Sequence, residues 1–126
     1  MRDGDDLIDW LLLERKGRPL DDLIADVVAQ VKGCQSLIAV EELVHPTPHM
    51  GLANVRGLLD TAQILGAVVA VGMLVVRVRP AKFGTAPLAS YPAALVGERE
   101  VSGKGRLRHA RAAWDIAGAG LKDHRR

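Results

Sequence analysis

Apolar and polar positions along the chain follow two different spacings, which predicts that helices and strands succeed one another. From Leu20 to Lys32 the apolar residues recur at helical spacing and aspartates take the other side, so an amphipathic helix is predicted there. Gly33 follows it as a natural helix end. A second, mostly apolar helix with a wide core stripe is predicted over residues 53–71, and Gly72 ends it.

Short apolar runs bounded by turn signals predict buried strands between these helices. Residues 36–43 form one such run, and residues 74–78 form another that stops before Pro80. A third apolar stretch, residues 7–14, fits either a strand or a helical turn, and its periodicity does not decide between them.

A final helix is predicted over residues 107–117, with Gly118 and Gly120 ending it. Residues 81–106 are expected to be mostly loop, with a short helical turn around residues 92–96. Alternation of strands and helices predicts an α/β domain whose strands lie parallel, because helical crossovers join them. In such sheets the functional crevice lies at the carboxyl ends of the strands.

Composition narrows the function classes. The chain has 126 residues, enough for one domain with one core, and only 3% of them are aromatic, which argues against a platform for stacking bases. The lone Cys34 excludes a disulfide within the chain and a Cys-rich zinc site, and it suits a reducing cytoplasm. The longest uncharged apolar run, residues 64–76, is too short for a membrane span, so no membrane partner is expected.

Charge is distributed unevenly. Residues 1–30 hold eight acidic and four basic side chains, whereas residues 77–126 hold eleven Lys or Arg and four Asp or Glu. This polarity indicates a polyanionic partner for the second half of the chain. The alternative is an ordinary solvated basic surface.

Two carboxylates are candidates for chemistry. Glu41 ends the first predicted strand, where an ionised side chain needs a cation, a donor or water, and a divalent metal is one solution. The alternative for Glu41 is a cap on a helix N-terminus or a solvated position, and Glu42 points to the opposite face of the strand. Asp115 is the possible partner, and its alternative is an ion pair with Arg111 one turn earlier.

The order of these motifs resembles the RuvC-type Holliday junction resolvases of the RNase H-like superfamily. Val40-Glu41 resembles the family's strand end with a carboxylate, followed by a loop and a long apolar helix. Val76-Arg-Val-Arg-Pro80 resembles the next strand, Ser102-Gly-Lys-Gly-Arg106 a basic Gly-rich loop, and Arg111–Ala117 the last helix with its Asp. The resemblance covers residues 20–118.

The resemblance implies an RNase H-like α/β domain over residues 1–126, with a central mixed or parallel sheet flanked by helices. It implies an endonuclease that resolves Holliday junctions or other branched DNA with Mg²⁺, or with Mn²⁺, in the cytoplasm of a bacterial or phage-infected cell and as a homodimer. Glu41 and Asp115 carry over as metal ligands, and His109 is a further catalytic candidate. The expected DNA contacts are the basic residues Lys104, Arg106, Arg108, Arg77 and Arg79.

Two departures from the family's pattern matter. The chain lacks the opening strand with "G-I-D-x-G", and Ala112 stands where the family has another acid or a His. The domain is therefore N-terminally incomplete, takes its first carboxylate from elsewhere, or has lost activity. The alternative function is a non-catalytic RNase H-like domain that binds nucleic acid or a protein. His45 and His49 would make an incomplete zinc site and are expected to be loop residues near the DNA.

Overall fold

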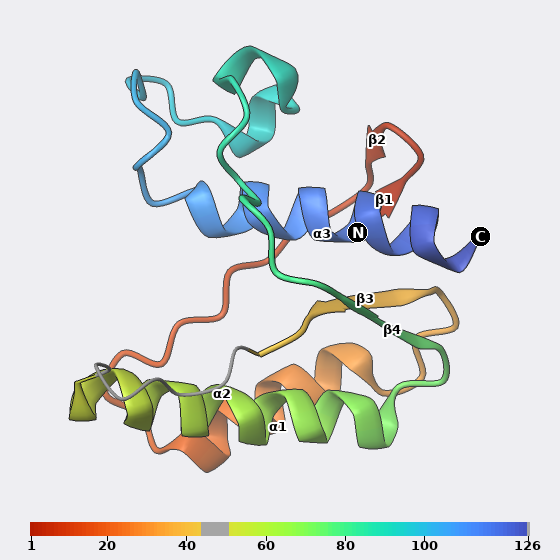
Figure 1. Cartoon of the computed structure of the whole chain (residues 1–126), viewed down its shortest axis with the longest axis vertical. Helices are drawn as coiled ribbons and strands as arrows, with labels where there is room; N and C mark the ends of the chain where they lie inside the picture. Colours follow the sequence, from red (N-terminus) through yellow and green to blue (C-terminus); the bar gives the residue numbers. More distant parts are fainter. Residues whose placement is uncertain (44–50, 126) are drawn as a thin grey trace.

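The computed structural model describes residues 1–43 and 51–125 and has a mixed α/β architecture (Figure 1). Three helices are present in this part of the chain: α1 (Leu20–Val31), α2 (Leu52–Val71) and α3 (Arg108–His124). Two single turns of 3₁₀ helix, η1 (Leu88–Ser90) and η2 (Ala93–Leu95), lie in the long segment before α3. The predicted helices over residues 20–32 and 53–71 and the helical turn at 92–96 are confirmed.

The strands form two separate pairs. β3 (Ile38–Glu41) and β4 (Val75–Val78) are parallel, in a register that sets Glu41 opposite Val78, so the prediction of parallel strands is confirmed. β1 (Arg2–Asp3) and β2 (Asp6–Leu7) form a small antiparallel hairpin that the hydrophobic pattern did not predict. Within the described residues each sheet has two strands, and the larger central sheet expected for an RNase H-like fold is not seen there.

The β3–β4 pair lies between helices. Figure 1 shows α1 and α2 on one side of these strands and α3 on the other. α1 begins after Pro19, whose fixed φ suits a helix start, and Asp21 and Asp22 in its first turn complement the helix dipole. Gly33 then takes a positive φ of 79° and turns the chain toward β3.

α3 is longer than predicted, and the expectation that Gly118 and Gly120 end it is wrong. Both glycines lie inside the helix. A Cβ at Gly120 would collide with the Cβ of Ala39 in β3, so glycine here permits a close helix–strand approach. Tertiary packing therefore outweighs the low intrinsic helix propensity of glycine at this position.

The fully buried core of the described residues is small. Its apolar members are Val68, Val78, Tyr91 and Leu95. One charged side chain, Arg111, is also completely buried. The β1–β2 hairpin attaches to α3 through Arg2, whose guanidinium lies 3.9 Å from the centre of the Trp114 ring and donates to the Trp114 carbonyl at 2.9 Å. Trp114 itself is only half-buried.

Candidate active site

Glu41 lies where the sequence predicts it, at the carboxyl end of a parallel strand. Its side chain is exposed, and its neighbour Glu42 donates a backbone hydrogen bond to the Val78 carbonyl at 2.8 Å. Within the described residues, the Glu41 carboxylate takes part in no hydrogen bond or ion pair. Both of its oxygens are therefore open to a ligand as far as the described part of the chain is concerned.

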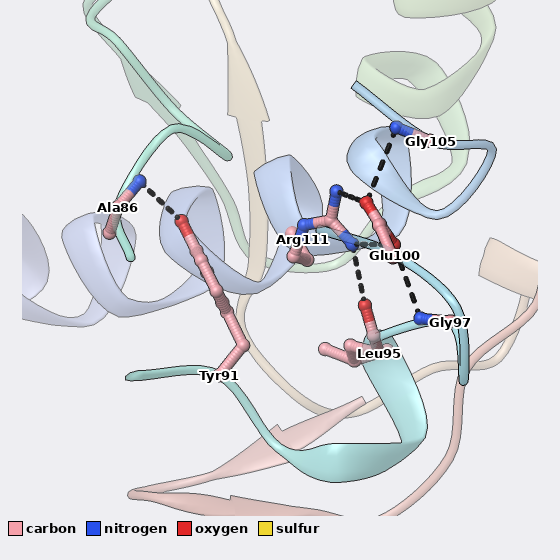
Figure 2. A network of polar contacts seen from close by, with 7 residues as sticks. All are labelled: Ala86, Tyr91, Leu95, Gly97, Glu100, Gly105 and Arg111. Atoms are coloured by element: carbon pink, nitrogen blue, oxygen red, sulfur yellow. Dashed lines mark hydrogen bonds and ion pairs between the residues drawn. The ribbon is translucent and has the colours of Figure 1, made fainter. Parts of the chain in front are cut away.

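Asp115 is held in a different way. Its Oδ2 accepts a hydrogen bond from the Gly84 amide at 2.8 Å and another from the Tyr91 hydroxyl at 2.7 Å. The Tyr91 hydroxyl in turn accepts from the Ala86 amide at 3.1 Å (Figure 2). Burial and then the hydrogen bond to Asp115 raise the pKa of Tyr91 above its ordinary value of 10.0, so the phenol stays a donor at neutral pH.

The two carboxylates lie on the same side of the sheet but on different flanks of α3. Glu41 shares the strand face of Ala39, which meets Gly120 of α3. Asp115 precedes Gly120 by five residues, a rotation of about 140° around the helix axis, so it points away from the strand and toward Gly84. In the described part of the chain, no group of three His, Cys, Asp or Glu side chains is arranged to hold a metal.

His109 lies on the first turn of α3, where it is exposed. It precedes Asp115 by six residues, which turns it about 120° away from that side chain on the helix. His45 and His49 lie outside the described residues.

The predicted DNA contacts are exposed residues of two regions. Lys104, Arg106 and Arg108 lie in the loop before α3 and at its start, and Arg77 and Arg79 lie in and just after β4. Arg106 forms an ion pair with Glu14 at 3.3 Å, and three-quarters of the Arg106 side chain is exposed. An exposed pair of this kind is weak and leaves the guanidinium available to a phosphate.

A buried ion pair anchors the loop that carries these basic residues, and sequence reasoning missed it. Arg111 donates from both terminal nitrogens to the two oxygens of Glu100, at 2.8 and 2.5 Å, and also to the Leu95 carbonyl at 2.9 Å (Figure 2). The amides of Gly97 and Gly105 donate to the same carboxylate at 3.1 and 3.2 Å. The expected alternative for Asp115, an ion pair with Arg111, is therefore wrong, because Arg111 is bound to Glu100.

The Arg111 guanidinium, helped by the Gly97 amide, lowers the pKa of Glu100 to about 2. Glu100 thus remains ionised at all ordinary pH values and closes a nine-residue loop, from Gly97 to Gly105, onto α3. A sequence signal for this cluster was present: Arg111 occupies a helix position flanked by Leu107 and Trp114, which together outline an inward face.

Scans of the chain against protein-family models, curated proteins and solved structures find no match.

Proposed function

We propose that this chain is an RNase H-like nuclease domain that cleaves branched DNA, such as a Holliday junction, with Mg²⁺ or Mn²⁺. The observation that carries the proposal is the position of Glu41, an exposed carboxylate at the carboxyl end of a parallel strand, beside a second strand that ends in exposed arginines. Carboxyl ends of parallel strands are the usual location of functional sites in open α/β sheets. The register sets Val78 opposite Glu41 and Arg77 opposite Val40, so Arg77 and Arg79 lie on the other face of the strand pair from Glu41. Positive charge at this end of the sheet suits a phosphodiester backbone.

The donor chemistry fits a hard divalent cation. Glu41 offers two oxygens with no described partner, and Asp115 retains Oδ1 while Oδ2 is held by Gly84 and Tyr91. Mg²⁺ prefers such oxygen ligands, and when bound to a nuclease it activates water and stabilises the leaving oxygen. His109 is the further candidate for proton transfer, because its imidazole is exposed in the first turn of α3.

Positive charge supports DNA as the partner. The Glu100–Arg111 pair holds the basic loop against α3, so Lys104, Arg106 and Arg108 come from one anchored region. Contacts of this type bind phosphates without reading base sequence, which suits recognition of a branched shape. Cys34 as the lone cysteine is consistent with action in the cytoplasm.

A second candidate function, non-catalytic binding of nucleic acid, has its own supporting observation. The Asp115 carboxylate is used to fasten the Gly84–Tyr91 segment to α3, and it is turned away from the strand that ends at Glu41. A protein that only binds DNA needs the basic residues and the anchored loop, and it needs no cation between these two carboxylates.

The decisive experiment incubates the chain with labelled four-way junction, flap and duplex DNA, with and without Mg²⁺. The nuclease proposal expects Mg²⁺-dependent cleavage of the branched substrates that Glu41→Gln abolishes while junction binding persists. Glu42→Gln is the matched control, since it removes a charge one residue further on and faces the other side of the strand.

Asp115→Asn tests the second carboxylate, and its melting temperature must be measured beside its activity because this side chain also holds structure. Cleavage that survives Glu41→Gln would refute the assigned site. Salt-sensitive junction binding with no cleavage in either metal would support the binding function instead.

A further inference from the structure

The outer edge of β3 carries backbone groups that have no partner. The amides of Ile38 and Glu42 donate to carbonyl groups at the two ends of β4, each at 2.8 Å, so the even-numbered residues of this segment pair with β4. The residues between them direct their amide and carbonyl groups to the opposite edge of the strand. Among the described residues, these groups of Leu37, Ala39 and Glu41 form no hydrogen bond. This edge is therefore open to a further strand.

A groove of about 550 Å³ lies beside this edge, on the side of β3 away from β4. Its walls come from the start of β3 and the residues just before it, from the second half of α3 and from the β1–β2 hairpin, and none of its lining residues belongs to β4. Figure 1 shows the hairpin beside the second half of α3. The groove has the volume of an ordinary ligand-binding pocket, and Ala39 is one of the residues that line it.

The strand edge and the wall of the groove together select an extended peptide. A peptide in the β conformation presents the row of donors and acceptors that complements an open strand edge. The Ala39 side chain faces α3, where Gly120 packs against it, and the α3 wall contributes the apolar residues Ala117 and Leu121. The side chains of an added strand that face α3 should therefore be apolar at alternate positions. A sheet of only two short strands also gains stability from a third strand.

Charge sets the direction of the peptide. Arg125 lines the groove near the residues that precede β3, and it forms no ion pair within the described part of the chain. The other arginine of the groove, Arg2, is already paired with Asp5 at 3.3 Å. At the opposite end of the edge lies the exposed carboxylate of Glu41, the last residue of β3. A strand antiparallel to β3 complements both charges when a basic residue begins it and an acidic residue ends it.

We propose that the groove beside β3 binds an extended peptide segment of a partner protein, which adds to the β3–β4 sheet as an antiparallel third strand. The segment has a basic residue first, then apolar residues at alternate positions, and a final carboxylate that reaches Arg125. The antiparallel direction also gives the stronger backbone pairing. The inference does not rest on nuclease activity, because it uses only the open edge of β3 and the second half of α3.

The probe is the synthetic peptide acetyl-Lys-Thr-Val-Thr-Val-Thr-Glu, added to the full isotope-labelled chain. Its lysine is placed to lie opposite Glu41, and its final glutamate to lie beside Arg125. Amide hydrogen exchange at Ala39 and Glu41, followed by NMR, should slow by about tenfold or more at saturating peptide, because both amides enter hydrogen bonds. The Arg77 amide faces the outer edge of β4 and is the internal control, since its exchange should not change.

Methylated peptides test the backbone pairing itself. In the antiparallel register the two valines lie opposite Leu37 and Ala39, so their amides point toward β3 and the threonine amides point away from it. N-methylation of both valines should weaken binding by about tenfold or more, since two hydrogen bonds are lost, whereas N-methylation of the threonines should change it by less than about twofold. Isothermal titration calorimetry measures these dissociation constants.

Charge reversal at the end of the groove tests the proposal on the protein side. Arg125→Glu should weaken peptide binding about fivefold, the upper range for an exposed ion pair. Lys122→Glu is the matched control, because Lys122 is exposed on the same helix and lies outside the groove. Absence of binding at about 1 mM peptide, or binding that valine methylation or Arg125→Glu leaves unchanged, would overturn the proposal. Loss of junction DNA binding in Arg125→Glu, without peptide binding by the wild type, would overturn it in favour of a nucleic acid.

Discussion

Arg111 and Glu100 form a two-bonded ion pair in which the arginine side chain has no exposure and the glutamate side chain keeps 9%. The pair joins the middle of α3 to the loop between Gly97 and Gly105, and a third bond from Arg111 reaches the Leu95 carbonyl. Every oxygen of the Glu100 carboxylate is satisfied, while the Nε of Arg111 has no hydrogen-bond partner among the described residues. Helix, loop and 3₁₀ turn are thus fixed by one charged contact in a domain with few buried apolar side chains.

Removing the arginine should cost much of the stability of this region. We expect Arg111→Met to lower the free energy of unfolding by about 3 kcal/mol, because breaking a buried pair leaves its partner group without compensation. Urea denaturation followed by tryptophan fluorescence measures the change. Arg108→Met, an exposed position one turn earlier on α3, should change the stability by less than about 0.5 kcal/mol. Equal losses in both variants would show that the ion pair does not stabilise the fold.

The Glu100–Arg111 pair also predicts how the stability of the fold depends on pH in the acidic range. The pKa of Glu100 falls from an ordinary 4.5 to about 2 on folding, so its stabilising contribution is complete above pH 4.5. That contribution is lost as the pH falls from 4.5 toward 2, because the unfolded chain binds the proton first. Thermal melts across this range should show a loss of stability that Glu100→Gln reduces and that Glu98→Gln, at an exposed position, leaves unchanged. A Glu100→Gln variant with the full acid sensitivity of wild type would contradict the assignment.

Local patterns were sufficient to predict much of the fold. The helices α1 and α2 begin and end within one residue of their predicted bounds, because each has an apolar stripe and a glycine directly after it or one residue later. The parallel pairing of β3 and β4 followed from the helix between them. The place of Glu41 in a short apolar run bounded by turn signals also predicted correctly that this residue ends a strand.

Features that depend on contacts distant in the sequence were not predictable in this way. The length of α3 depends on Gly120 meeting Ala39 in β3, and no pattern within α3 reveals that contact. The partners of Asp115 are Gly84 and Tyr91, which are 31 and 24 residues away, so the helical rule of four-residue spacing pointed to Arg111 instead. The β1–β2 hairpin has only two residues per strand, too few for a periodic signal.

Tyr91 is the single tyrosine of the chain, so its ionisation can be followed alone. We expect the phenolate absorbance to appear with a midpoint above pH 10.0 in the folded protein, because burial and the hydrogen bond to Asp115 both oppose the anion. Since the folded pKa is the higher one, this group's contribution to stability is full below pH 10.0 and is lost as the pH rises past it.

Two variants separate the causes of that shift. Asp115→Asn should move the midpoint back toward 10.0, since the anionic acceptor is gone while the ring stays buried. Tyr91→Phe should cost about 1.5 kcal/mol of unfolding free energy, the usual value for a hydrogen bond to a charged group. A midpoint at or below 10.0 in the folded wild type would mean that the Tyr91–Asp115 bond is not present in solution.

Glycines in two helices should respond in opposite ways to the same substitution. Gly57 lies in α2, is exposed and has open space where a Cβ would be added, so Gly57→Ala should stabilise the fold by about 0.5–1 kcal/mol through helix propensity. Gly120→Ala gains the same propensity in α3, but its methyl group would collide with Ala39, and overpacking of this kind costs about 1–3 kcal/mol. Denaturant unfolding of the two variants under one set of conditions measures both signs. If Gly120→Ala were as stabilising as Gly57→Ala, the close approach of α3 to β3 would be absent, and Glu41 would no longer share a sheet face with the helix that carries Asp115.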